Sequence, residues 1–503
     1  MTFFSPLRGC FLLTFCVVPL FAQADGAKVR PPNIVFLLAD DLGYGDLGCF
    51  GSPVIKTPHL DRLAAQGVKL QQCYAASPNC SPARTGILTG RSPYRVGMYD
   101  YIRFAALHIP KTERTIPALL RQAGYQTMFA GKWHCSGRFR DGTQPGPGDH
   151  GFEHWFANAR NFGRNPKGFV RNGKALPVQS GWMAEIVVDE TIAWLQQRDS
   201  KRPFCTFLWF SEPHTPVVAA EEFKEKYQNP ASDRAARSLR FGGEQVVRRR
   251  AQWDQRHRYF GCVSMLDHHI GRLLAKLDAL GLRDNTIVVF TSDNGPEHRT
   301  PTAFGSPGPS RGAKGHMHDG GIHVPGIVRW PGRIKAGSVC AAPVNGTDYL
   351  PTLCKVAGAP IPQDRPIDGA DVMPALTATG KVDRKTAMLW WLWHARGKKQ
   401  VAMRDGDYKL LAHMTPQAGP IGNGDARPPK GWSPMRFIKE SRLAGFALYD
   451  LKADPGESRD LRTVDPKRFE RLRAKMEKLH REIQAEGPTL ELGRGKGARR
   501  RRG

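Results

Sequence analysis

The sequence predicts an α/β protein with a large, mostly parallel β-sheet flanked by helices, and a smaller C-terminal antiparallel sheet packed with one helix. Three observations support this prediction. Continuous apolar runs recur along the chain, segments with helical spacing separate them, and the pattern changes after about residue 374. Apolar runs of this length are typical of parallel strands buried on both faces, and their alternation with helices indicates a parallel sheet.

Polar residues directly follow four of the apolar runs. The runs cover about 33–38, 126–130, 204–210 and 286–290, with helical patterns at 57–67 and about 259–280. The residues that follow them are Asp40, Asp41, Lys132, His134, His214, Asp293 and Asn294. Because ligands of parallel sheets bind beyond the carboxyl ends of the strands, we expect these side chains to meet at one edge.

The C-terminal part carries shorter runs. Strand-like segments at 387–393, 401–411 and 448–451 predict the small antiparallel sheet, with a turn at 404–407 interrupting the second segment. A helix is expected at about 466–486. The region from about 416 to 432 is rich in Pro and Gly and is expected to be a surface loop.

The N-terminus predicts export. Arg8 precedes an apolar run over 11–22, and Ala22-Gln23-Ala24 fits a small-x-small cleavage site. A retained anchor is the alternative, but the run is shorter than the roughly 20 residues that a membrane span needs. We therefore expect a signal peptide at 1–24, a large domain at 25–375, an α+β subdomain at 376–490 and a basic disordered tail at 491–503. Export would be to the periplasm or the extracellular space, with no stable membrane span.

The cysteines set few constraints. Removing the leader removes Cys10 and Cys16 and leaves eight, and conversion of one of these would leave seven. An odd set scattered over a large domain argues against a full disulfide framework, although one or two bridges stay open and cannot be paired from sequence.

The net charge of +28 indicates an acidic partner. Export and the lack of a nucleic-acid-binding signature argue against nucleic acid. The runs at 248–250 and 494–503 are either solvated charge or a means of retention on a sulfated polysaccharide.

A second group of candidate residues starts at Cys80. The order Cys80-Ser81-Pro82-Ala83-Arg84 places a thiol at a helix entrance, where free amides and Arg84 favour an anion. The simpler interpretation is a buried structural thiol with a surface arginine. Lys314 lies in a later glycine-rich segment, 311–325, which is expected to lie close to a ligand.

Asp40, Asp41, Asp293 and Asn294 offer only hard oxygen ligands. This set suits Ca²⁺ or Mg²⁺ better than Zn²⁺. A pair of aspartates after one strand is more often a turn or a helix cap, but two acidic pairs at strand ends in one chain weaken that interpretation.

The segment CSPARTGILTGR, residues 80–91, resembles the signature of the type I sulfatases, an arylsulfatase-like family of the alkaline-phosphatase superfamily. Five matching elements occur in the expected order between about Asn33 and Leu461. The resemblance implies an alkaline-phosphatase-like fold and a sulfuric ester hydrolase whose catalytic domain is the 25–375 segment. It implies one Ca²⁺ held by Asp40, Asp41, Asp293, Asn294 and residue 80. It also implies that a maturation enzyme converts Cys80 to Cα-formylglycine, whose hydrate attacks the sulfate ester.

The resemblance assigns further roles. Lys132 and Lys314 contact the sulfate, Arg84 polarises the hydrate, and His134 and His214 transfer protons, with His214 also contacting substrate. Asp293 would help to deprotonate the hydrate. Asn158, Arg160 and Arg164 are candidates for additional sulfate contacts, and His323 stands where relatives often have Arg.

A sulfated carbohydrate is the expected substrate, with aryl sulfate as the simpler case. The positive charge suits a polyanion, and Trp182, Trp391 and Trp393 could stack on sugar rings. Two alternatives stay open. One is a phosphonate or phosphodiester hydrolase of the same superfamily, and the other is a non-catalytic binder of sulfated glycans whose Cys80 is unmodified.

Overall fold

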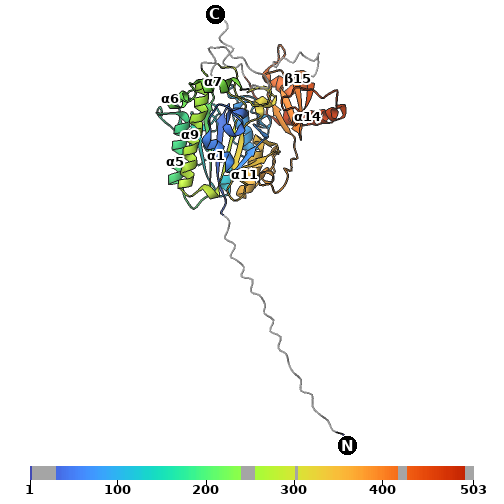
Figure 1. The fold of residues 1–503 in the computed structure, drawn as a ribbon. Coiled ribbons are helices and arrows are strands. Elements are labelled where there is room, and N and C mark those ends of the chain that lie inside the picture. The colour runs from blue at the N-terminus through green and yellow to red at the C-terminus, as the bar shows by residue number, and fades with distance from the viewer. Residues whose placement is uncertain (3–29, 240–254, 301–303, 417–427, 493–503) are drawn as a thin grey trace. The chain divides into compact units, whose positions relative to one another are not determined.

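A ten-stranded mixed β-sheet organises the described part of the chain from Pro31 onward (Figure 1). The computed structural model describes residues 1–2, 30–239, 255–300, 304–416 and 428–492. The strand order is β11-β2-β10-β9-β1-β8-β4-β5-β6-β7. These strands are β1 (Asn33–Asp40), β2 (Val68–Leu70), β4 (Gln126–Lys132), β5 (His154–Asn158), β6 (Val170–Arg171), β7 (Lys174–Ala175), β8 (Phe204–Pro213), β9 (Thr286–Ser292), β10 (Gly326–Arg329) and β11 (Ser338–Cys340).

The centre of the sheet is parallel, as the apolar runs predict. Strands β9, β1, β8, β4 and β5 pair in parallel, whereas β10, β6 and β7 pair antiparallel toward the two sides. Every residue of β1 is buried, which explains its unbroken apolar sequence. The predicted fold class is therefore confirmed.

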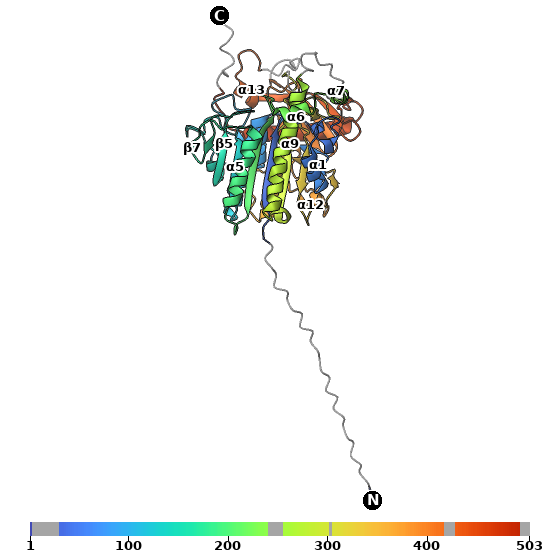
Figure 2. The same ribbon diagram turned by 60° about the vertical axis from the view of Figure 1, so that its left-hand side comes forward.

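Helices cover both faces of the sheet (Figure 2). On one face α5 and α9 pack against β8 and each other, and α1 packs against α9 and β10. On the other face α2, α4 and α11 contribute to a separate apolar core. The described helices are α1 (Pro58–Ala65), α2 (Cys80–Thr89), α3 (Pro93–Val96), α4 (Ile116–Gln122), α5 (Met183–Gln197), α6 (Glu221–Glu225), α7 (Pro230–Arg237), α9 (Arg256–Ala279), α10 (Asp319–Ile322), α11 (Tyr349–Ala357), α12 (Met373–Leu376), α13 (Pro434–Glu440) and α14 (Pro466–Glu486).

The topology brings the strand-end residues to one edge of the sheet. Asp40 ends β1 and Lys132 ends β4, while His214 and Asp293 directly follow β8 and β9. These four strands are neighbours in the parallel centre, so their carboxyl ends lie together.

The C-terminal sheet is antiparallel and packs with α14. Its order is β13 (Met388–Trp391), β14 (Val401–Asp405), β15 (Tyr408–Pro416) and β16 (Ser441–Asp450). A separate pair joins β3 (Cys73–Tyr74) to β12 (Val344–Asn345). The run over 401–411 forms two strands joined by a turn, as predicted, whereas the last strand begins well before the expected residue 448.

A buried ionic cluster ties this sheet to the large domain. Lys409 on β15 lies 2.6 Å from Asp319 on α10 and 3.0 Å from Glu457, and the side chains of all three are nearly or completely buried. Tyr74 donates to Asp319 at 2.8 Å and accepts from Arg404 of β14 at 2.5 Å. The C-terminal sheet is therefore anchored close to the segment that carries Lys314.

Two of the tryptophans expected to stack on sugars are core residues. Trp391 is 3% exposed and lies 4.2 Å from the rings of both Tyr94 and His480, and Trp393 is 6% exposed. The expectation for Trp391 is wrong, because apolar strand residues of the small sheet face its core. Trp393 follows that strand and lines the same cleft as Cys80. Trp182 precedes α5 and carries the guanidinium of Arg164 over its ring at 5.3 Å.

Several expectations lie outside the described residues: almost all of the signal peptide and the basic tail, the 248–250 run and most of the 416–432 loop. The eight cysteines of the described ranges are free, so the disulfides left open by the sequence do not form among them. None of the helices in the described ranges combines the length and apolar character that crossing a bilayer requires.

Candidate active site

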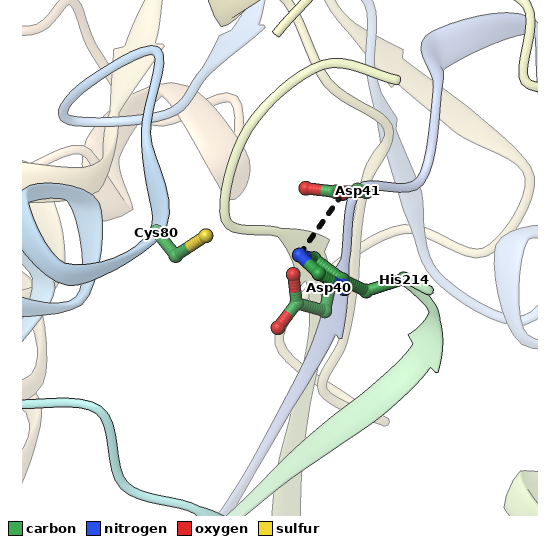
Figure 3. Close-up of side chains that lie close together, drawn as sticks. All are labelled: Asp40, Asp41, Cys80 and His214. Carbon is green, nitrogen blue, oxygen red and sulfur yellow. Dashed lines mark ion pairs between the residues drawn. The ribbon is translucent and has the colours of Figure 1, made fainter. Parts of the chain in front are cut away.

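Four side chains from three segments converge at the carboxyl edge of the sheet (Figure 3). Potential ligand atoms of Asp40, Asp41, Cys80 and His214 all lie within 4.8 Å of one another. Cys80 is the first residue of α2, and the Asn79 side chain accepts from its amide at 3.0 Å. The expected helix entrance is therefore present, and its thiol faces the strand-end carboxylates.

Arg84 lies one turn later and is completely buried. Its Nε and Nη2 donate to Asp293 Oδ2 at 3.1 and 2.8 Å, its Nη2 also donates to Asp40 Oδ2 at 2.9 Å, and its Nη1 donates to the Lys132 carbonyl at 2.9 Å. The Trp209 ring lies 5.0 Å away. Arg84 is thus a central buried counter-charge, which excludes the simpler interpretation of a surface arginine.

Two lysines complete the positive charge of the site. Lys132 donates to Asp40 Oδ2, and Lys314 donates to Asp41 Oδ1 at 2.5 Å. Burial disfavours the charged form of Asp40, but Lys132, His214 and Arg84 outweigh it and hold the pKa of that carboxyl well below its ordinary value. Asp40 is therefore a carboxylate throughout the physiological range.

The oxygen ligands predicted for a metal are brought together, with one difference. Asp293 Oδ2 is held by Arg84 and its Oδ1 accepts from the Asp41 amide at 3.2 Å, so Asp293 stands outside the four-residue group. Asn294 donates to Asp41 Oδ1 at 2.7 Å. Within the described ranges, Asp40 Oδ1 and Asn294 Oδ1 are buried and have no hydrogen-bond partner. Two such oxygens beside Asp41 fit a hard cation such as Ca²⁺.

The two candidate histidines occupy different environments. His214 Nδ1 lies 2.7 Å from the Thr215 carbonyl, and its Nε2 lies 3.6 Å from Asp41 Oδ2. Its pKa is lowered, mainly by burial. Burial, followed by the charges of Lys132 and Arg84, lowers the pKa of His134 well below its ordinary value. Burial therefore disfavours the protonated form of both rings, and Asp41 partly opposes this effect at His214.

The encoded thiol of Cys80 is not activated. Burial raises its pKa to about 12, although Lys132 and Lys314 act in the opposite direction. A thiol nucleophile needs a depressed pKa. The site therefore supplies an electropositive environment without generating a thiolate.

Two residues of the site carry left-handed backbone. Asp41 has φ 65° and His134 has φ 49°. Non-glycine residues in this region are strained, and such strain concentrates at functional sites. Asp41 directly follows β1, and His134 lies two residues after the end of β4.

The three candidates for additional sulfate contacts, Asn158, Arg160 and Arg164, lie in different environments. Asn158 bonds to the Lys167 carbonyl and the Arg160 amide, so it shapes the loop after β5, and Arg164 packs on Trp182. Arg160 lines the cleft above Cys80. His323 is held by Ser310 and the Gln71 carbonyl and does not line that cleft.

Sequence reasoning missed three residues near the site: Asn161, Glu297 and Arg396. The Asn161 amide lies 2.8 Å from His214 Nδ1, and Arg396 from the C-terminal part pairs with Glu297 at 2.8 Å. Glu297 follows Asn294 by three residues, which was the available signal. Arg396 gave none, because its position depends on the packing of the small sheet.

The site opens into a basic cleft of about 1670 Å³. Its lining includes Cys80, Lys132, His134, His214 and Lys314 at the base. A helix N-terminus, buried Arg and Lys groups and two imidazoles that face this cleft are the features of a site that binds a tetrahedral oxyanion and can stabilise charge that develops on it.

Comparison with known proteins gives a more specific class of enzyme. A family profile described as Sulfatase matches residues 32–359, and one described as N-sulphoglucosamine sulphohydrolase, C-terminal, matches residues 313–418. The N-acetylgalactosamine-6-sulfatase of Canis lupus familiaris is 33% identical over 418 residues, which cover 77% of this chain and 72% of the relative. Human arylsulfatase A is 32% identical over 478 residues, covering 88% and 86%.

A solved structure extends the likeness of fold. The protein crystallised with its substrate D-glucosamine-2-N,6-O-disulfate superposes with a TM-score of 0.68 at 24% identity, covering 92% of this chain and 100% of that one. The chain belongs to the sulfatase family. It is therefore a sulfuric ester hydrolase, and the prediction of the family and of an enzyme is confirmed.

Proposed function

We propose that this enzyme removes sulfate from a sulfated carbohydrate, with Cα-formylglycine derived from Cys80 as the nucleophile and one Ca²⁺ as cofactor. The observation that carries the proposal is the position of Cys80. Its sulfur faces Asp40, Asp41 and His214 at a helix N-terminus, yet its thiol pKa is raised to about 12. A residue at the reactive centre that is inert as encoded fits a precursor that a maturation enzyme oxidises.

The cation would be held by Asp40, Asp41, Asn294 and the modified residue 80, with Asp293 as a further carboxylate. The buried partnerless oxygens of Asp40 and Asn294 support this assignment. The oxygen set favours a hard cation over zinc. Bound there, Ca²⁺ supplies charge that polarises the sulfate and the nucleophile.

The side chains of the active site have different roles in the reaction. The hydrate of the aldehyde supplies a hydroxyl for attack on sulfur. Lys132 and Lys314 orient the sulfate and stabilise the charge that grows on its oxygens in the transition state. Arg84 fixes Asp40 and Asp293 through hydrogen bonds at 2.8 to 3.1 Å and orients the carboxylates around residue 80.

The histidines handle protons. His214 Nδ1 is occupied by the Thr215 carbonyl, so its Nε2 exchanges protons with the substrate and protonates the departing alcohol. His134 is neutral and buried next to Lys132, which suits it to accept a proton from residue 80 when sulfate is released. Sulfate and a free hydroxyl are the products.

The net charge of the chain and the proteins similar to it both indicate the class of substrate. The chain carries a net charge of +28 and its cleft is basic, which favours polyanions. The canine relative is named for a sulfated amino sugar, and the solved neighbour binds a sulfated glucosamine. We extend the same chemical class to this enzyme, and the signal sequence would export it to the compartment where such glycans occur.

A comparison of aryl esters that share one leaving group and differ in the esterified oxyanion tests the proposal. Purified enzyme is assayed with an aryl sulfate, an aryl phosphate and an aryl phosphonate of the same phenol, alongside Cys80→Ala. The expected result is turnover of the sulfate far above the other two esters and none in Cys80→Ala. Faster turnover of phosphate or phosphonate would replace sulfatase with the alternative hydrolase of the superfamily.

A further inference from the structure

The cleft above Cys80 is larger than a single sulfated sugar requires. Its volume of about 1670 Å³ exceeds the roughly 300–1,000 Å³ of a pocket for one small ligand. The loops that line it follow β4, β5 and β9 and are joined by segments of the C-terminal part. The space beyond the base of the site therefore has room for neighbouring sugar residues.

The lining of the cleft is strongly basic. It includes Arg103, Arg138, Arg160, Arg299 and Arg396, and Glu297 is the one carboxylate among the described lining residues. Two of the arginines are already neutralised. Arg103 pairs with Asp100 at 2.5 Å, and Arg396 pairs with Glu297 at 2.8 Å.

The other three form what we call the arginine rim: Arg138, Arg160 and Arg299. All three are exposed, and in the described part of the chain no carboxylate lies within ion-pairing distance of their guanidinium groups. The lysines at the base differ, because Lys132 and Lys314 are buried and paired with Asp40 and Asp41. The rim therefore presents unpaired positive charge in addition to Lys132 and Lys314, which are the groups assigned to the scissile sulfate.

The rim extends across the sheet. Arg160 follows β5 and Arg299 follows β9, and the strand order places β4, β8 and β1 between them. Four strand spacings correspond to roughly 19 Å between the backbones of β5 and β9. Groups that approach from loops on both sides of Cys80 contact an extended ligand more readily than a monosaccharide.

We propose that the arginine rim is a second anion-binding subsite, which binds a sulfate or a carboxylate on a sugar residue next to the one that is desulfated. The substrate class is thereby a polyanionic oligosaccharide. This inference rests on the proposed function for its substrate, but its binding test needs no turnover. Exposed guanidinium groups also keep the subsite open to either anion, because both accept bidentate hydrogen bonds from arginine.

Binding is measured in full-length Cys80→Ala protein, so that no ligand is consumed. The probes are a κ-carrageenan tetrasaccharide, which carries sulfates and no carboxylate, a hyaluronan tetrasaccharide, which carries carboxylates and no sulfate, and neutral maltotetraose. The test variant adds Arg138→Ala, Arg160→Ala and Arg299→Ala. The charge-matched control instead adds Arg121→Ala, Arg283→Ala and Lys335→Ala, which lie in segments before β4 and β9 or after the antiparallel β10, at the opposite edge of the sheet.

The expected result is that the rim variant binds at least one charged tetrasaccharide about tenfold or more weakly, while the control changes by about twofold or less. Loss of κ-carrageenan binding identifies a second sulfate, and loss of hyaluronan binding identifies a carboxylate. Equal losses in rim and control variants, or unchanged binding of both probes in the rim variant, would overturn the subsite. Thermal unfolding of each variant checks that it is folded. Aryl sulfate turnover by the Cys80 enzyme tests the proposed function separately.

Discussion

The Asn294 side chain donates to Asp41 Oδ1 at 2.7 Å and leaves its own Oδ1 buried without a partner in the described structure. The Oδ1 of Asp40 is likewise buried without a partner among the described residues. This arrangement costs free energy unless a ligand binds there, because an unsatisfied buried oxygen loses its hydration.

Calcium should therefore stabilise the enzyme. At a Ca²⁺ concentration of about 100 times Kd, binding to the folded state adds about 2.7 kcal/mol to the free energy of unfolding. We expect a chelator to lower the midpoint of thermal unfolding and added Ca²⁺ to restore it. Asn294→Ala should reduce this shift, and an exposed Asn172→Ala should not. A chelator-insensitive midpoint in the parent enzyme would argue against the metal site.

Arg84→Lys should abolish most activity while preserving charge. A lysine cannot bridge Asp293, Asp40 and the Lys132 carbonyl at once, so we expect kcat/KM for an aryl sulfate to fall by about 100-fold or more. Arg95→Lys is the matched control, since Arg95 bonds to Asp368 and Glu486 away from Cys80. Equal losses of activity in the two variants would indicate a structural effect only.

Lys409→Met should destabilise the fold strongly. It leaves Asp319 and Glu457 buried without their shared counter-charge, and breaking a buried pair costs about 3–5 kcal/mol. Chemical denaturation measures the loss, and Asp319→Asn with Glu457→Gln in the same chain should recover part of it. Lys385→Met removes an exposed pair with Asp383 and should cost less than about 1 kcal/mol. Similar costs for the two lysines would contradict the role of the cluster.

Asp267→Asn should change the pH dependence of stability. Asp267 accepts from the amides of His59 and Leu60 at the start of α1, and burial raises its pKa to about 7. The folded state thus keeps a proton that the unfolded state releases near pH 4, so this carboxyl lowers stability as pH rises from about 4 to about 7. The stability of Asp267→Asn relative to the parent should increase by about 2 kcal/mol between pH 5 and pH 8. A difference that is independent of pH would rule out this titration.

The sequence predicted the parts of the fold that depend on local pattern. Strand β1 is buried on both faces and therefore needs apolar residues along its length. Asp40 and Asp41 could be recognised because they end this apolar run. The order of such runs then predicted which polar residues share an edge. The helix entrance at Cys80 followed from local capping chemistry in the same way.

The remaining features depend on contacts between distant residues. Trp391 was misassigned because an apolar strand residue and a sugar-stacking tryptophan have the same local pattern, and only packing against Tyr94 distinguishes them. The pairing of Lys409 with Asp319 spans 90 residues and depends on how β15 packs against α10. The left-handed φ of Asp41 likewise follows from the turn after β1 and not from its residue type.

The most direct test of the account is the chemical identity of residue 80 in the active enzyme. Mass spectrometry of the peptide that contains residue 80 should show a mass below that of the encoded cysteine, reaction with a hydrazine reagent for aldehydes and no alkylation by iodoacetamide. Across preparations, the converted fraction should rise in proportion to aryl sulfate turnover. Full turnover by protein in which Cys80 remains an alkylatable thiol would contradict the account.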